Sequence, residues 1–124
     1  MGPLQTGVGS APPLAVAGTV ALFALFLSLT AHLAARNVLG DVPIKNAFLV
    51  GPVPAGVAVV AAALELPSIP AVLVALVLDA VLVWYVYDLD RRFTAGVTAI
   101  HAVVSVILGS VIFSLYVLVR SAPG

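Results

Sequence analysis

SIPAVLVALVLDAVLVWYVY, residues 68–87, is an apolar stretch in which Asp79 is the one charged side chain. About 20 apolar residues in a helix span the roughly 30 Å hydrocarbon core of a bilayer. An ionised Asp near the centre of such a helix costs about 3 kcal/mol on insertion scales, so it usually faces the protein interior and has a partner there. The stretch therefore predicts a membrane-spanning helix, with Asp79 as the first candidate functional residue.

The composition of the whole chain agrees with a membrane protein. Of its 124 residues, 63% are hydrophobic and 8% are charged, whereas an ordinary soluble domain has about 25% charged residues. Five basic and five acidic residues cancel, so no basic surface would attract nucleic acid. The absence of cysteine excludes disulfides, thiolate metal sites, cysteine nucleophiles and cysteine lipid anchors. The expected partner is the lipid bilayer.

Charged and Gly/Pro-rich points divide the sequence into four apolar segments, at about residues 13–36, 44–64, 68–87 and 93–119. None of them shows the alternation of an outer-membrane strand, and each is long enough to span as a helix. The connections are short, which favours antiparallel neighbours. We expect an all-α, polytopic transmembrane four-helix bundle of up-down antiparallel hairpins, with residues 1–124 forming a single integral membrane domain.

Basic residues predict how this bundle is oriented in the cell membrane. They are Arg36 and Lys45 at the first connection, Arg91 and Arg92 at the third, and Arg120 near the C-terminus. Short loops rich in Lys and Arg stay cytoplasmic, so we expect the first and third connections in the cytoplasm and both termini outside. The residues before the first span contain no Lys or Arg, so we expect that span to be a retained helix rather than a cleaved signal peptide.

Asp79 and His101 are predicted to lie at the same depth in the membrane. The hairpin formed by the third and fourth spans turns near Asp90, and each of the two residues lies eleven positions from it. At about 1.5 Å per residue, both lie near the bilayer midplane. One interpretation is a structural hydrogen bond or ion pair that fixes helix register, and another is a proton or cation pathway. Two such groups are too few for a metal site, and no cofactor is expected.

Further polar and small residues recur at helical spacing on the fourth and first spans. On the fourth span, the stripe that contains His101 also holds Thr94, Thr98, Ser105 and Gly109. Such residues are typical of helix contacts in lipid. On the first span, Ser28, His32 and Arg36 form a predicted cytoplasmic-side polar face, from which Thr30 is displaced.

The face formed by Ser28, His32 and Arg36 has two interpretations. It could contact lipid phosphate or a neighbouring helix. Alternatively, it could form a functional cytoplasmic mouth that leads from His32 toward His101.

The second span is interrupted by Gly51, Pro52, Pro54 and Gly56. Proline inside a helix removes a backbone hydrogen bond and clashes with the preceding turn, so we expect a kink or local unwinding here. Such a break is either a packing kink or part of a transport site, as in discontinuous transporter helices. The two glycines would also permit close backbone approach.

The sequence contains no G-x-S-x-G or H-E-x-x-H catalytic motif and no phosphate-binding glycine loop. We therefore do not expect an enzyme. The segments SLTAHLAARNVLGDVPIKNAFLVGPVPAG (28–56) and HAVVSVILG (101–109) resemble small four-span membrane proteins of unknown function from halophilic archaea. This resemblance implies a membrane location and no particular activity.

Two functions follow as hypotheses. The first is a structural or accessory helical-bundle subunit, either of a homo-oligomer or of a larger membrane complex. The second is a small proton- or cation-coupled transporter that uses Asp79 and His101.

Overall fold

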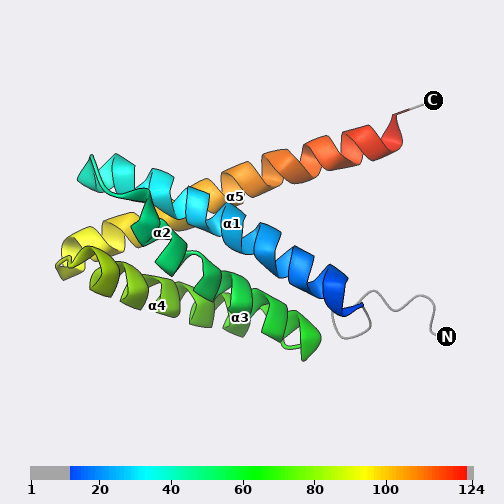
Figure 1. Ribbon diagram of the computed structural model, residues 1–124, viewed down its shortest axis with the longest axis horizontal. Coiled ribbons are helices and arrows are strands. Elements are labelled where there is room, and N and C mark those ends of the chain that lie inside the picture. The colour runs from blue at the N-terminus through cyan, green and yellow to red at the C-terminus, as the bar shows by residue number, and fades with distance from the viewer. Residues whose placement is uncertain (1–11, 123–124) are drawn as a thin grey trace.

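The structure is a computed structural model that describes residues 12–122, in which the regular elements are helices (Figure 1). They are α1 (Pro13–Leu39), α2 (Ile44–Val50), α3 (Pro52–Ala63), α4 (Ser68–Tyr87) and α5 (Arg91–Ser121). Because α2 and α3 continue one another, residues 12–122 contain four spans that are long and apolar enough to cross a membrane. The predicted all-α fold of four packed helices is confirmed. Residues 1–11 and 123–124 of the predicted single domain lie outside the described part.

Local sequence signals explain where the helices begin and end. Pro13 is the first residue of α1, a position where its fixed φ and missing N–H cost nothing. Gly40 ends α1 with φ of 86°, which glycine adopts without strain. At the start of α5, the Asp90 carboxylate accepts a hydrogen bond of 2.9 Å from the backbone N–H of Phe93. This cap starts α5 at Arg91, earlier than the predicted residue 93.

The interrupted second span changes direction between α2 and α3 (Figure 1). Gly51, at the junction, keeps helical dihedral angles, and its backbone N–H donates to the carbonyl of Ala47 at 2.9 Å. Pro52 and Pro54 have no N–H, so the carbonyls of the residues four positions earlier lose their usual helical donors. The span is therefore bent at Gly51 rather than unwound.

α1 and α4 each contact α2, α3 and α5, so the second span and α5 connect these two helices. The main buried cluster consists of small side chains, namely Ala31, Ala34, Ala35, Ala47, Val50, Val83 and Val97. Small residues let helix backbones approach closely in lipid. The C-terminal part of α5 extends beyond this packed region (Figure 1).

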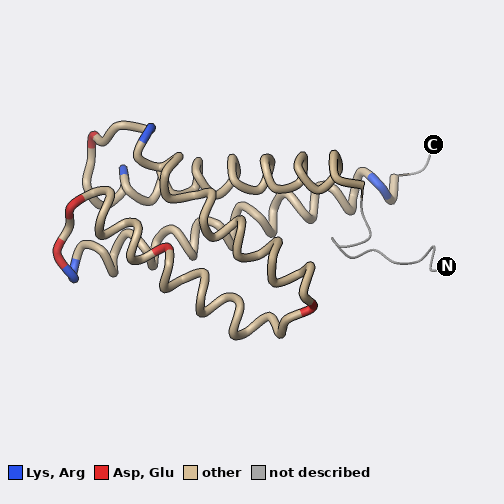
Figure 2. Tube along the Cα trace, turned by 60° about the horizontal axis from the view of Figure 1, so that its bottom comes forward, with Lys and Arg blue, Asp and Glu red and all other residues tan. Residues whose placement is uncertain are grey.

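Most charged residues gather at one end of the bundle (Figure 2). We call this the charged end and define it by the residues of the α1–α2 and α4–α5 connections and their flanks: Arg36, Asp41, Lys45, Asp88, Asp90, Arg91 and Arg92. The buried alanine and valine cluster lies between this end and the middle of the bundle, because its members come from the adjacent turns of α1, α2, α4 and α5.

Gly51 and Gly56 differ in their surroundings. A Cβ atom at Gly51 would overlap the backbone nitrogen, the Cα and the Oγ of Ser28 on α1. A Cβ at Gly56 would meet no atom of the described residues within 4 Å. Gly56 does not make the close approach that its sequence suggested, because α3 has no close neighbour on that side. Of the two glycines, Gly51 is the one that makes a close backbone contact.

We expect Gly51→Ala to lower the stability of the protein by about 1–3 kcal/mol, because the added methyl group forces α1 and α2 apart. Gly56→Ala is the matched control on the same span. It should be neutral or stabilising by up to about 1 kcal/mol, since alanine favours the helix and has room. Thermal unfolding in detergent measures both changes. Equal stability of the two variants would contradict the close contact between Gly51 and Ser28.

Candidate functional site

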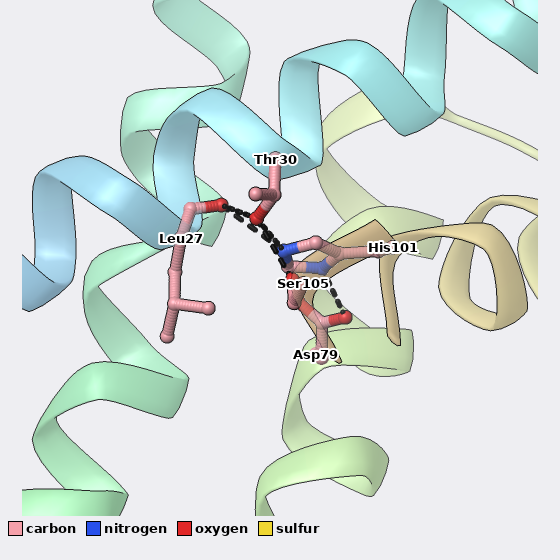
Figure 3. A network of polar contacts seen from close by, with 5 residues as sticks. All are labelled: Leu27, Thr30, Asp79, His101 and Ser105. Carbon is pink, nitrogen blue, oxygen red and sulfur yellow. Dashed lines mark hydrogen bonds and ion pairs between the residues drawn. The ribbon is translucent and has the colours of Figure 1, made fainter. Parts of the chain in front are cut away.

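Asp79 of α4 and His101 of α5 meet inside the bundle, where they are 4% and 3% exposed. The Nδ1 of His101 lies 2.7 Å from the Oδ2 of Asp79 (Figure 3). This distance is typical of hydrogen bonds that involve a charged group. The two residues are thus brought together, as their equal distance from the α4–α5 turn predicted.

α1 provides the remaining partners of His101. The Nε2 atom lies 3.0 Å from the backbone carbonyl of Leu27 and 3.0 Å from the Oγ1 of Thr30 (Figure 3). The Thr30 hydroxyl donates to the Leu27 carbonyl at 3.1 Å and accepts a hydrogen bond of 2.8 Å from the Ser105 hydroxyl. One imidazole ring therefore joins three helices. We call Leu27, Thr30, Asp79, His101 and Ser105 the polar network.

The geometry of the network specifies where its protons lie. A carbonyl oxygen only accepts, so the Nε2 that faces Leu27 carries a proton. The Nδ1 faces a carboxylate oxygen, and the proton between them belongs either to His101 or to Asp79. Both arrangements are neutral overall: an imidazolium beside a carboxylate, or an imidazole beside a carboxylic acid. Removing either proton would leave a net charge buried in a low-dielectric interior, which is expensive.

One carboxylate oxygen of the Asp79–His101 pair makes no hydrogen bond within the described residues. The Oδ1 of Asp79 is buried and has no hydrogen-bond partner within residues 12–122. Buried carboxylate oxygens are normally paired, so Oδ1 is the one open position of the network. Nothing comparable to a metal centre surrounds it, since the described residues contain no group of three or more His, Asp or Glu that could hold an ion.

Thr30 is a member of the polar network that the sequence pattern does not single out. It lies off the face of Ser28, His32 and Arg36, yet it is 1% exposed and bonded within the network. A usable signal was present in the positions around it. Thr30, Ala31 and Ala34 lie three, four and seven positions after the buried Leu27, a helical spacing, and such small residues are typical of the face of a helix that contacts its neighbours.

The three residues of the predicted polar face on α1 differ in their burial. Ser28 is buried, donates to the carbonyl of Ala24 at 2.7 Å and packs against Gly51. His32 is half-buried, and Arg36 is exposed. The structure places Ser28 in a helix–helix contact because α2 covers that side of α1. Within the described part of the chain, His32 has no hydrogen bond to His101.

The predicted stripe on α5 divides into two parts. Toward the C-terminus, Ser105 bonds to Thr30, and a Cβ at Gly109 would lie 3.8 Å from the Phe26 ring of α1, so this part packs on α1. Toward the charged end, Thr94 and Thr98 have buried hydroxyls without hydrogen-bond partners among residues 12–122. On the C-terminal side of His101, the Ser105 hydroxyl is hydrogen-bonded. On the side of the charged end, the hydroxyls of Thr94 and Thr98 have no partner among residues 12–122.

We expect the Nε2 of His101 to carry a proton, because it faces the Leu27 carbonyl, which can only accept a hydrogen bond. The chain has two histidines, so ¹⁵N-histidine labelling gives a simple NMR spectrum in lipid bilayers, and His32→Asn assigns it. A bare Nε2 on His101 would contradict the hydrogen bond to the Leu27 carbonyl.

Replacing Thr30 by valine should cost about 1 kcal/mol of stability and shift the Nε2 signal.

Comparison with known proteins provides the family of the chain. No curated protein and no solved structure matches it. One family model, described as a family of unknown function (DUF7473), matches residues 10–123. This match covers nearly the whole chain, including every residue of the polar network. The chain belongs to this DUF7473 family.

Proposed function

We propose that this multi-span membrane protein is a structural or accessory subunit whose helices are held in register by the polar network. One observation carries the proposal: His101 of α5 is bonded at the same time to Asp79 of α4 and to Leu27 and Thr30 of α1. The bonds cross three helices at one level. A side chain that bonds to two other helices in this way fixes the positions of the helices relative to one another.

The physical argument concerns how helices choose their positions in lipid. Apolar side chains gain little from leaving lipid for a protein interior, so packing and hydrogen bonds decide how helices associate. A slip of one turn would move α5 by about 5.4 Å and separate His101 from both of its partners. Asp79 and His101 would then be buried and unpaired. The network therefore penalises every register except one.

The same hydrogen bonds argue against an enzyme. A general base needs a free lone pair near a nucleophile. In the network, the Nε2 of His101 faces a carbonyl and donates, while the Ser105 hydroxyl donates to Thr30. Neither group is arranged to activate the other. These contacts support a protein without catalytic activity.

The proposal includes lipid and a protein assembly as the partners. Large apolar side chains are exposed along much of α4 and along the C-terminal part of α5. Such surfaces suit acyl chains or the helices of other subunits, either of the same chain or of a larger membrane complex. We further propose that the charged end faces the cytoplasm and that both termini face outside, since this end contains Arg36, Lys45, Arg91 and Arg92.

We expect Asp79→Asn and His101→Asn each to lower stability by about 3–5 kcal/mol, because each leaves a buried partner unpaired. The double variant should lose less than the sum of the two, which a double-mutant cycle detects. Asp41→Asn, at an exposed loop carboxylate, is the matched control and should change stability by less than about 0.5 kcal/mol.

A flux assay separates this role from transport. The wild-type protein and a correctly folded Asp79→Asn variant, reconstituted in liposomes with a pH-sensitive dye, should show the same proton permeability as empty liposomes. Proton or cation flux in the wild type that the variant loses would refute the structural role and favour a transporter.

The orientation is testable because the natural chain contains no cysteine. Single substitutions Asp41→Cys, Ser68→Cys and Ser121→Cys mark the first connection, the second connection and the C-terminal end. A membrane-impermeant thiol reagent added to intact cells should label Ser68→Cys and Ser121→Cys, and should label Asp41→Cys only after lysis. The opposite pattern would reverse the topology.

A further inference from the structure

Buried polar atoms without partners are unevenly distributed in this bundle. Within residues 12–122 they are the Nδ1 of His32, the Oδ1 of Asp79, the Oη of Tyr87 and the Oγ1 atoms of Thr94 and Thr98. Four of the five belong to the α4–α5 hairpin, and these four lie at the Asp79–His101 pair or between it and the charged end. The hydroxyls of the network itself, on Thr30 and Ser105, are bonded.

The four atoms of the hairpin share one interface. Asp79 and Tyr87 are two turns apart on the same side of α4, and side chains of a helix lean toward its N-terminus. Tyr87 therefore leans toward Asp79. On α5, Thr98 and Thr94 lie about one and two turns from His101 on its own face. Together they form a line of polar groups from Thr94 to Asp79.

A groove opens at the charged end of this line. It has a volume of about 450 Å³ and is lined by Ala80, Val81, Trp84, Arg91, Thr94 and Ala95. Thr94 thus belongs both to the groove and to the line of buried hydroxyls. Arg91 is exposed at the groove, at a depth where headgroups and water reach the protein. The hydroxyl of Thr94 is itself buried, so the line of polar groups begins directly beneath the groove.

Leaving these groups unpaired would be costly. A buried hydroxyl or carboxylate oxygen without a partner costs more than a made hydrogen bond returns. Bound water resolves this when several polar groups are close enough to hold it, and such waters are typical of protein interiors. Three hydroxyls and one carboxylate oxygen provide these partners. Val83 and Val97, which are 0% and 1% exposed, lie at the same levels and limit the path to a narrow file.

We propose that a file of water connects the groove at the charged end with the Oδ1 of Asp79, past Thr94, Thr98 and Tyr87, so that the Asp79–His101 pair exchanges protons with the charged-end side alone. The path ends at the pair, because on the other side of His101 the hydroxyls of Thr30 and Ser105 are already bonded. This goes beyond the structural role, since a structural network needs no access to solvent. It also needs no flux across the membrane.

Water-edited solid-state NMR of the full chain in lipid bilayers tests the path without any substitution. In ¹³C-threonine-labelled protein, magnetisation from water should reach Thr94 and Thr98 faster than Thr30, because this transfer requires a water molecule close to the labelled side chain. Thr30 is the internal control, because it is 1% exposed but lies in the bonded network. Transfer to Thr98 that is no faster than to Thr30 would overturn the proposal.

Variants then test whether the path reaches the pair. The exchange rate of the His101 ring N–H protons with water should fall at least about fivefold in Thr98→Val and in Tyr87→Phe, which remove one hydroxyl each at nearly constant shape. Ser110→Ala, on the exposed side of α5, should leave the rate unchanged. Unaltered ¹⁵N shifts of His101 show that the pair is intact in each variant. Unchanged exchange in both path variants would refute the connection.

Discussion

The hydrogen bond between Asp79 and His101 is the constraint on which the arrangement of the spans depends. A carboxylate in the middle of an apolar span has to be neutralised or paired, and the partner has to lie at the same depth on a neighbouring helix. α4 and α5 satisfy this because they form a hairpin with a short turn, so equal distances along the chain give equal depths. The Nε2 of His101 then requires a second acceptor, and this requirement brings in α1 through the Leu27 carbonyl at 3.0 Å.

One turn of α1 is fixed from two directions. Leu27 and Thr30 face His101, while Ser28, between them in sequence, contacts Gly51 so closely that no Cβ fits there. The bend at Gly51 and the polar network thus act on the same turn from different sides. The alanine-rich cluster toward the charged end allows the backbones to come this close. A larger residue at any of these contacts would separate His101 from its carbonyl acceptor as well as disturb packing.

How much of this is predictable from the sequence depends on the kind of information each feature carries. The spans follow from apolar length, and the meeting of Asp79 and His101 follows from counting along a hairpin. The role of the Leu27 carbonyl does not follow, because every residue has a backbone carbonyl and none is marked in the sequence. Thr30 was missed for a related reason: α1 and α5 are distant in sequence, so the rotation of α1 relative to His101 is set by packing. For Ser28 the sequence leaves lipid phosphate and a neighbouring helix open, because helical spacing groups residues by face without saying which helix covers that face.

A buried ion pair is seldom the most stable choice, since well-packed apolar side chains of similar volume often serve as well or better. Register specificity accounts for the Oδ2 of Asp79, the two nitrogens of His101, Thr30 and Ser105, all of which are bonded. It does not account for Oδ1, which a purely structural network would be expected to satisfy with one further donor. Thr98 lies one turn from His101 on the same face, yet within residues 12–122 its hydroxyl has no partner. In the proposed path, water supplies the missing partners, since it can bond both to the Oδ1 of Asp79 and to hydroxyls that do not bond to each other. Access to water distinguishes a closed structural pair from one that exchanges protons with the charged-end side.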